Sequence, residues 1–457
     1  MDTENSCWKV LMLPWLAYGH ISPFLELAKR LSHRNIETYL CSTPANLSSI
    51  KNKIPGKYSS SIHLLELHLP DFLPQLPPHN HTTNGLPPNL LSTLRKALDS
   101  SKMDLSRILK SLQPDLLIHD ILIEWAAGAA FSHNIPSVSF LTSSATMFSF
   151  YYHSLTKPDE LEYPFPAIKF TGPEQDMIKG NIEAFRKRSQ ERDLDNQGAA
   201  RVVLIKSNRE IEGKYIDYLS QLTERKIVPV GPLVSADPSP DDGNSDLMEW
   251  LGKKGEFSTV FVSFGSEYFL KREEIEEIAY ALEALSNVNF LWVVRFPGDE
   301  EKRVQDELPG GFLERTQERG KIIEKWAPQA KILGHPSVGG FVSHCGWNSL
   351  MESIHFGVPI IAMPKQFDQP VNAKLVVELG VGVGVDRDER GRFTREEIGK
   401  VIKDVVVGKI GQELRRKVWE KRELLRANGE EEIDGLVQEI AQLCGKSSVE
   451  GAPSIKN

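Results

Sequence analysis

A chain of 457 residues with 40% hydrophobic and 25% charged residues has ordinary globular composition, and its length predicts two or three domains. The net charge of −8 at pH 7 excludes the basic footprint of a nucleic-acid-binding protein. The four cysteines, Cys7, Cys41, Cys345 and Cys444, lie far apart without a C-x-x-C pair, so they predict neither a zinc site nor a disulfide framework.

The N-terminus gives no sign of a targeting segment. It starts with acidic residues and lacks the basic region and long apolar region of a signal peptide. No apolar stretch approaches the roughly 18 residues of a membrane span. We therefore expect a cytoplasmic protein in a reducing setting, with no membrane span.

Apolar runs alternate with segments of helical spacing along the first half. Strands are predicted at residues 9–15, 36–41, 62–67, 115–119 and 137–141. Ser22-Pro23 resembles an N-cap followed by the first residue of a helix, and further helices are predicted over 91–111 and after Ile121. Alternating β and α elements predict a parallel, doubly wound sheet.

A stretch rich in Pro, Gly, Ser and Asp at residues 231–246 predicts a linker, although a long surface loop within one domain would have the same composition. The alternation then restarts, with a helix expected at 272–285 and strands at 258–264, 290–295, 321–325, 340–343 and 358–363. The fold class is therefore α/β with two similar halves. We predict domains at residues 1–234 and 251–445, a linker at 235–250 and a frayed tail at 446–457.

The segment from Trp326 to Gln369 is the most informative part of the chain. Within it a strand ending at Ser343 is followed by a tight turn, and Asn348 opens a helix. Ligands of open α/β sheets bind at the carboxyl ends of strands, and a helix N-terminus there offers N–H groups and a positive dipole end to phosphate. Glu352 lies on the same helix face, where a carboxylate can accept bonds from two vicinal ribose hydroxyls.

This segment, with its strings WAPQ, HCGWNSLMESIHFGVP and FDQ, resembles the signature box of plant family-1 UDP-glycosyltransferases, and the resemblance covers the rest of the chain in order. It implies the GT-B fold, in which two Rossmann-like domains face each other across the active-site cleft. The N-terminal domain would shape the acceptor pocket, and the C-terminal domain would hold the UDP-sugar.

The resemblance implies a role for each matching position, although each residue alone would be unremarkable. It implies that the nucleoside is held by Trp326 stacking on uracil, Ala327 pairing with its edge, Gln329 nearby and Glu352 on the ribose. It implies that the diphosphate is held by His344, Asn348, Ser349 and Ser266, of which Ser266 is a weak signal by itself. It implies that the sugar is held by Trp347, Asp368, Gln369 and Thr142.

His20 is the candidate catalytic base. It follows the first strand in the string AYGHISP; a lone loop histidine is more often structural, but the strand-end position and the family's G-H-x-x-P context favour catalysis. Asp120 ends the strand at 115–119 on the same edge and resembles the partner that fixes the tautomer and stabilises the imidazolium. His119 alternates to the other side of that strand, so we predict a structural role for it. The implied mechanism is a single inverting displacement by an acceptor hydroxyl.

Two other patterns invite alternative readings. D-x-D occurs at Asp193/Asp195 in a polar helical stretch and at Asp386/Asp388 before a turn, and we predict that neither binds a metal. The run from Gly380 to Gly384 resembles a dinucleotide fingerprint but leads into a charged turn, which disfavours an NAD-dependent reductase. We expect no cofactor besides the UDP-glucose donor, and no obligate protein partner.

The acceptor is the least readable feature. Phe148, Phe150, Tyr151 and Tyr152 would suit an aromatic cleft or the core equally well. Strings at residues 81–88, 207–215 and 263–269 resemble the branch of the family that extends the sugar of a glycoside, with a partial mismatch at 206–207. Three hypotheses follow: an enzyme extending flavonoid or terpenoid glycosides, an enzyme acting on a plain aglycone, and an inactive UDP-sugar-binding protein. The pair of His20 and Asp120 speaks against the third.

Overall fold

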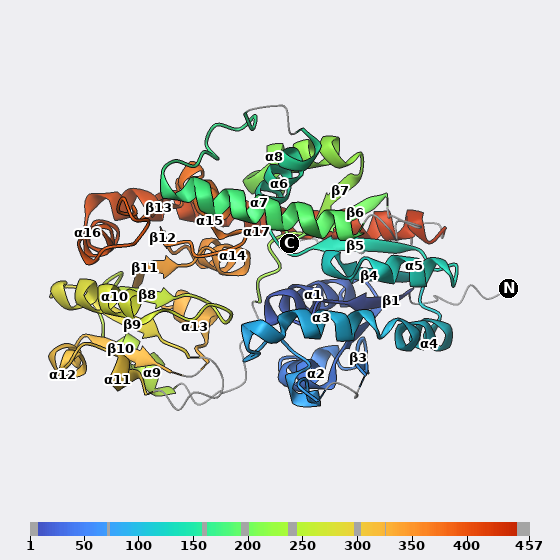
Figure 1. Cartoon of the computed structure of the whole chain (residues 1–457), viewed down its shortest axis with the longest axis horizontal. Helices are drawn as coiled ribbons and strands as arrows, with labels where there is room; N and C mark the ends of the chain where they lie inside the picture. Colours follow the sequence, from blue (N-terminus) through green and yellow to red (C-terminus); the bar gives the residue numbers. More distant parts are fainter. Residues whose placement is uncertain are drawn as a thin grey trace, which may run out of the picture.

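The computed structural model describes residues 8–70, 74–157, 162–192, 201–235, 245–296, 303–324 and 326–445. The chain forms two α/β halves, each built around one parallel sheet, that lie side by side (Figure 1). Parallel strands need crossover helices, and these cover both faces of each sheet.

The first sheet belongs to the N-terminal half. Among the described residues its strands run in the order β3 (Ile62–Glu66), β2 (Ile36–Ser42), β1 (Trp8–Leu13), β4 (Leu116–Asp120), β5 (Ser137–Leu141), β6 (Val202–Ile205) and β7 (Lys226–Pro229). Its helices are α1 (Tyr18–Ser32), α2 (Pro44–Lys51), α3 (Leu91–Asp99), α4 (Lys102–Leu112), α5 (Trp125–Phe131), α6 (Ala145–Thr156), α7 (Pro173–Arg192) and α8 (Arg209–Thr223). The strand order reverses between β1 and β4, which is where such sheets bind ligands.

Short 3-10 helices add four turns to the described part of this half, at η1 (Gly56–Tyr58), η2 (Pro78–Asn80), η3 (Pro88–Leu90) and η4 (Ile121–Ile123). The last of them follows β4 directly. Its first turn is capped by the carboxylate of Asp120, which accepts from the backbone N–H of Leu122 at 2.9 Å.

The second sheet repeats the arrangement in the C-terminal half. Its described strands run in the order β10 (Gly320–Ile323), β9 (Asn289–Val293), β8 (Thr259–Ser263), β11 (Val338–Ser343), β12 (Ile360–Ala362) and β13 (Gly382–Gly384). Its helices are α9 (Ser245–Gly252), α10 (Arg272–Ala284), α11 (Val304–Glu307), α12 (Phe312–Thr316), α13 (Gln329–Leu333), α14 (Trp347–Phe356), α15 (Gln369–Glu378), α16 (Arg395–Val406) and α17 (Lys409–Leu443). The reversal here lies between β8 and β11, so both halves are Rossmann-like.

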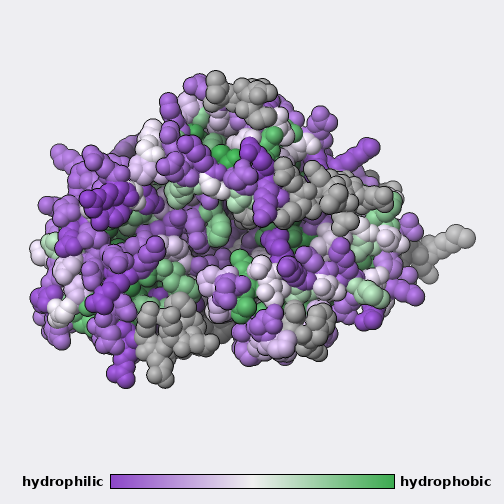
Figure 2. Space-filling view, in the orientation of Figure 1, coloured by the Kyte–Doolittle hydropathy of each residue, from purple (hydrophilic) through white to green (hydrophobic). Residues whose placement is uncertain are grey.

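The halves share hydrophobic contacts as well as a chain connection. One buried cluster combines α6 residues such as Phe148 with Trp347 and Met351 of α14 and Leu375 of α15. The long helix α17 leaves the C-terminal half and packs Ile433 on the core beneath the first sheet. In Figure 1, α7 lies across both halves, and Figure 2 shows a largely hydrophilic face with scattered hydrophobic patches, several of them near the seam between the halves.

The structure differs from the sequence-based expectations at several boundaries. The first helix begins at Tyr18 instead of Ser22, so Pro23 lies inside it. The helix expected over 91–111 is two helices, α3 and α4, separated by Ser100 and Ser101. In the expected linker, residues 245–250 are helical in α9, whereas 236–244 lie outside the described residues, as does the predicted tail from 446.

Helix α17 also bears on the predicted domain boundaries, which stay predictions. Its first part covers the second sheet and its last part covers the first, so the segment up to residue 445 contacts both halves. Of the helices in the described ranges, none combines the length and the apolar character that a membrane span requires.

Candidate active site

His20 and Asp120 meet at the carboxyl edge of the first sheet. Nδ1 of His20, in the first turn of α1, lies 2.7 Å from Oδ2 of Asp120 at the end of β4, and the hydroxyl of Thr142 lies 3.0 Å from the same nitrogen. A carboxylate only accepts hydrogen bonds, so Nδ1 carries the hydrogen and Nε2 keeps its lone pair. Nε2 has no hydrogen-bond partner within the described part of the chain, and 27% of the His20 side chain is exposed. This geometry leaves the lone pair of Nε2 available to accept a proton.

The surroundings of His20 favour its charged form. Burial lowers the pKa of His20, but the charge and hydrogen bond of Asp120 outweigh burial, and the charges of Glu267 and Asp368 add to them. The pKa therefore lies above its ordinary value. Asp120 is fully buried and is fixed by the N–H of Leu122, so its carboxylate is held in place beside the imidazole.

His119 lies on the other side of β4, as the alternation of the strand predicts. Its side chain is buried, with Nδ1 3.1 Å from the carbonyl of Asp120 and Nε2 3.5 Å from the hydroxyl of Ser139. Burial lowers the pKa of His119, although Asp120 partly opposes this. A buried neutral histidine of this kind is structural.

His344 follows β11 at the carboxyl edge of the second sheet and lies between two glycines. A Cβ at Gly265 would lie 2.8 Å from Nε2 of His344, and one at Gly346 would lie 2.5 Å from the same atom. Gly265 also has a φ of +79°, which other residues rarely adopt. Burial lowers the pKa of His344 to about 4, with a backbone bond to Ser263 opposing it. The ring is therefore neutral near pH 7.

The start of α14 is joined to the N-terminal half. Asn348 donates from Nδ2 to the carbonyl of Gly19 at 2.7 Å, and its Oδ1 accepts from Nζ of Lys206. The indole N–H of Trp347 donates to the carbonyl of Lys206 at 2.6 Å. The indole has a single N–H, so a contact of Trp347 with sugar hydroxyls would have to use its backbone N–H.

Gln329, Ser349 and Glu352 form one hydrogen-bonded group. Nε2 of Gln329 donates to Oε2 of Glu352 at 2.7 Å and to the hydroxyl of Ser349 at 3.1 Å. Burial raises the pKa of Glu352, while the bond from Gln329 and the charge of Lys206 lower it in part. The second oxygen of Glu352 is left for a ligand, which is the arrangement that a ribose contact needs.

Asp368 and Gln369 lie at the start of α15. Oδ2 of Asp368 accepts from Ser143 at 2.5 Å across the seam, and the charge of Asp368 acts on His20. Oε1 of Gln369 accepts from the backbone N–H groups of Lys365 and Gln366, both at 2.9 Å. These bonds use both lone pairs of the Gln369 carbonyl, so its NH₂ is the group left for a sugar hydroxyl.

The remaining residues predicted to bind the UDP-sugar lie close to the seam between the two halves. Trp326 is 47% exposed, and its ring meets that of Tyr18 edge-on with centroids 5.0 Å apart. The carbonyl of Ala327 accepts from the N–H of Gln329 at 2.9 Å. Ser266 follows Gly265 in the turn after β8 and makes no hydrogen bond within the described ranges.

For two charged residues at this seam, the sequence predicts no role. Lys206 follows β6, and Glu267 follows the turn after β8. Lys206 could have been noticed as a lysine directly after an apolar strand, at the edge where His20 and Asp120 lie. Glu267 belongs to one of the three acceptor strings, but its role could not be derived from the sequence.

The three strings that resemble the glycoside-extending branch, residues 81–88, 207–215 and 263–269, lie in different parts of the structure. Thr83 of the first string donates to Oε1 of Glu267 in the third at 3.0 Å, so these two strings touch across the seam. The second string is structural: Glu212 is buried and accepts from the N–H groups of Ala145 and Thr146, and from Ser207 at 2.5 Å. It holds the N-terminus of α6 in place.

The aromatic residues of α6 belong mainly to the core. Phe148, Phe150 and Tyr151 are buried in the cluster shared by both halves, and Tyr152 packs against it. The hydroxyl of Tyr151 donates to the carbonyl of Phe367 at 3.1 Å. This burial favours the core interpretation over an open aromatic cleft.

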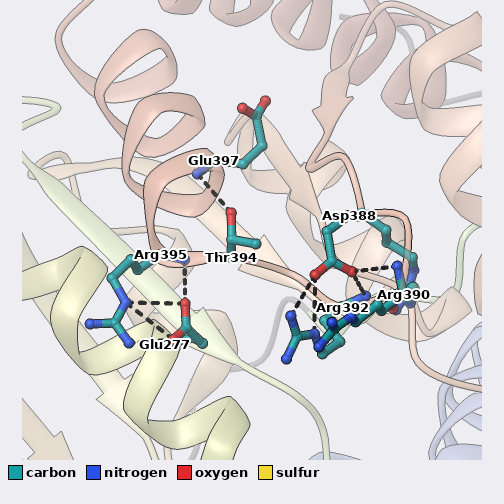
Figure 3. A network of polar contacts seen from close by, with 9 residues as sticks. Glu277, Asp388, Arg390, Arg392, Thr394, Arg395 and Glu397 are labelled. Carbon is teal, nitrogen blue, oxygen red and sulfur yellow. Dashed lines mark hydrogen bonds and ion pairs between the residues drawn. The ribbon is translucent and has the colours of Figure 1, made fainter.

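The second D-x-D pair forms part of a turn. Oδ1 of Asp388 accepts from the N–H groups of Arg390 and Arg392, and Oδ2 accepts from the Arg392 guanidinium at 2.8 and 3.0 Å (Figure 3). The first pair, Asp193 and Asp195, lies outside the described residues. Within the described ranges, no three His, Cys, Asp or Glu side chains are grouped as a metal site requires.

Comparison with known proteins assigns relatives to both halves. A family model described as UDP-glucoronosyl and UDP-glucosyl transferase matches residues 225–414, and one described as glycosyltransferase, N-terminal domain, matches residues 8–235. A beta-D-glucosyl crocetin beta-1,6-glucosyltransferase from Gardenia jasminoides is 52% identical, over 94% of this chain and 98% of its own. UDP-glucosyltransferase 29 from Panax ginseng is 50% identical, over 98% of this chain and 100% of its own. The crystal structure of TcCGT1 in complex with UDP superposes with a TM-score of 0.81 at 25% identity, covering 96% of this chain and 100% of that one.

Proposed function

The chain belongs to the UDP-glucuronosyl and UDP-glucosyl transferase family, and from that membership we propose that it transfers glucose from UDP-glucose to a sugar hydroxyl of a plant glycoside. It is a UDP-glycosyltransferase, and its two Rossmann-like halves are those of the GT-B fold.

In the proposed reaction, Nε2 of His20 takes the proton of an acceptor hydroxyl. The hydroxyl oxygen forms a bond to the anomeric carbon while the bond from that carbon to the UDP oxygen breaks, so the sugar is inverted and UDP leaves as an anion. The proton stays on His20, where Asp120 stabilises the imidazolium. N–H groups at the start of α14, with Ser349 and neutral His344, would hold the leaving diphosphate without a metal.

The contact between Thr83 and Glu267 carries the proposal of a glycoside acceptor. Glu267 is exposed at the seam, and its charge acts on His20 from the opposite half. Oε1 of Glu267 accepts a hydrogen bond from the Thr83 hydroxyl, which leaves Oε2 to accept from the hydroxyls of an acceptor sugar. A site that bonds hydroxyls rejects a bare aglycone strongly, because its own polar groups then stay unpaired. The Gardenia relative is named for adding glucose to glucosyl crocetin.

The test is a paired assay of flavonol and triterpene aglycones against their monoglucosides at fixed UDP-glucose. Glu267→Gln should raise KM for the glucoside about tenfold, because a bond to a charged acceptor is lost, with little change in KM for UDP-glucose. Glu273→Gln, a matched change at an exposed glutamate of α10, should change neither. Equal kcat/KM for aglycone and glucoside, or attachment to the aglycone itself, would favour an aglycone glucosyltransferase instead.

Glucose is the proposed donor sugar. The NH₂ of Gln369 is placed to donate to a sugar hydroxyl, and an axial O4, as in galactose, would leave that buried donor unpaired at a cost of about 1–3 kcal/mol. Both relatives described above are named as glucosyltransferases. A higher kcat/KM for UDP-galactose or UDP-xylose than for UDP-glucose would contradict the proposal.

A cytoplasmic location is proposed from the cysteines. Cys41 and Cys345 are buried without a disulfide in the described part of the chain, and burial raises the pKa of the Cys41 thiol to about 12. Such thiols are unreactive and suit a reducing compartment. A fluorescent fusion found in the secretory pathway would contradict this proposal.

A further inference from the structure

Lys206 is a buried lysine at the boundary between the two halves. It follows β6 in the N-terminal half, and only 2% of it is exposed. Lysines are almost never buried unless their charge has partners. Its Nζ donates to Oδ1 of Asn348, and its carbonyl accepts from Trp347, so both its ends are bonded to the first turn of α14 in the other half.

The same asparagine reaches the helix that carries the base. Pro23 has no N–H, so the carbonyl of Gly19, four residues before it in α1, lacks its helical partner. Nδ2 of Asn348 fills that position at 2.7 Å. Because Lys206 can only donate, it fixes Oδ1 of Asn348 toward itself and Nδ2 toward Gly19, the residue before His20.

Two carboxylates act on the charge of Lys206: Glu352 of α14, and Glu26 of α1, which is itself paired with Lys29 at 2.8 Å. Burial lowers the pKa of Lys206 to about 8, with Glu352 and Glu26 opposing it. Burial likewise raises the pKa of Glu352, with Gln329 and Lys206 opposing it. Lys206 and Glu352 therefore each stabilise the charged form of the other in a site where burial favours the neutral forms.

We propose that Lys206 is a positioning residue of the donor site, which keeps Glu352 ionised to accept ribose hydroxyls and holds Asn348 against the Gly19 carbonyl beside His20. This inference rests on the proposed function, because it takes Glu352 as the ribose ligand. Lys206 does not touch the reacting atoms. It acts through Glu352 on UDP affinity, and through Asn348 it joins the start of α14 to the start of α1.

The test measures the dissociation constant of UDP by calorimetry at pH 7.5, for the full chain without acceptor. Lys206→Met should weaken UDP binding about tenfold, because loss of the ammonium raises the pKa of Glu352 further and favours its protonated form, which accepts fewer hydrogen bonds. Lys206→Gln keeps a donor toward Asn348 but removes the charge, so it should weaken UDP binding as much. If Lys206→Met does not fold, Lys206→Gln alone tests the proposal. Lys206→Gln binding UDP like the unmodified protein would contradict the proposal.

A double-mutant cycle isolates the action through Glu352. Once Glu352→Gln has removed the carboxylate, Lys206→Met should weaken UDP binding less than about threefold further. A further loss of about tenfold in that background would show independent action and overturn the inference. Lys374→Met is the matched control: Lys374 of α15 is partly buried with its ammonium on Glu174 of α7, so UDP affinity should stay within about twofold.

The pH dependence gives a readout that a purely structural role would not move. UDP affinity of the unmodified protein should not fall as pH rises through about 8, because Glu352 stays ionised at a pH where even Lys206 has lost its proton. In Lys206→Met, by contrast, affinity should rise with pH as Glu352 ionises without help. Identical profiles for the two proteins would contradict the inference. A failure of the unmodified protein to bind UDP would instead contradict the proposed function.

Discussion

Two histidines that follow strands beside the switch points of the two sheets have pKa values shifted in opposite directions. His20 follows the first strand of the N-terminal sheet, and His344 follows the strand at the switch point of the C-terminal sheet. Both are partly buried, and burial lowers the pKa of each. Yet the pKa of His20 lies above its ordinary value, while that of His344 falls to about 4.

The difference comes from charged neighbours rather than from burial. His20 has a fixed carboxylate in Asp120 and feels two more in Glu267 and Asp368. His344 is enclosed by Gly265 and Gly346, which bring the ring close to the backbone and offer no charge. The same residue type is therefore suited to act as a base in one half and as a neutral hydrogen-bonding group in the other.

His20→Ala should have the largest effect, a loss of roughly 10²–10⁴-fold in kcat. The proton acceptor at the reacting hydroxyl is removed, whereas the donor groups on α14 stay in place. UDP affinity measured by calorimetry should be nearly unchanged. The control is His68→Ala, because His68 is exposed on the same half. A His20→Ala variant that keeps more than about a tenth of kcat would remove His20 from the role of base.

Asp120→Asn should come next, with a loss in kcat of about tenfold or more. The base must be neutral, so kcat/KM falls as pH drops through the pKa of His20. The charge of Asp120 raises that pKa. Removing the charge should therefore shift the fall of kcat/KM on the acidic side to lower pH, and the maximum value of kcat/KM should also decrease. The full pH profile of kcat/KM checks both changes. An acidic limb that stays in place would mean that another group titrates.

How far the sequence predicts this site depends on how the residues are spread along the chain. The candidate donor residues from 326 to 369 lie within one short stretch of sequence, on α13, α14 and the start of α15 and on the loops that lead into them. His20 and Asp120 are 100 residues apart, but the strand-end rule brings them to one edge, and the structure shows them in contact. The two-sheet fold followed from the alternation of apolar runs.

Other features depend on contacts that the local sequence does not encode. The sequence predicts that the first helix starts at Ser22-Pro23, because proline is favoured at the first helical position, whereas the helix in fact starts at Tyr18 and Asn348 from the other half satisfies the carbonyl that Pro23 leaves open. The burial of Lys206 and the bonds to the Gln369 carbonyl arise in the same way, from backbone groups that meet only after folding. Tertiary partners of this kind cannot be read from local spacing.

His344→Gln should have a smaller effect than either change at the base. A neutral histidine contributes hydrogen bonding without charge, so its loss should cost about 0.5–1.5 kcal/mol and raise KM for UDP-glucose roughly 2–12-fold. The acidic limb of kcat/KM should stay in place, because His344 is already neutral throughout that range. A displaced limb would show that His344, and not His20, titrates during catalysis.

Chelation should have the smallest effect, with no loss of rate in EDTA. The proposed reaction places UDP on N–H groups at the start of α14, so it needs no divalent ion to hold the leaving group. Asp388 is committed to a turn: its two oxygens accept from the N–H groups of Arg390 and Arg392 and from the Arg392 guanidinium, and these bonds lower the pKa of Asp388. Asp388→Asn should therefore leave kcat and KM for UDP-glucose unchanged and at most loosen the turn. Loss of activity in EDTA with recovery on adding Mn²⁺ or Mg²⁺ would contradict this prediction. If Asp388→Asn abolished that recovery, the pair Asp386 and Asp388 would be assigned to the metal after all.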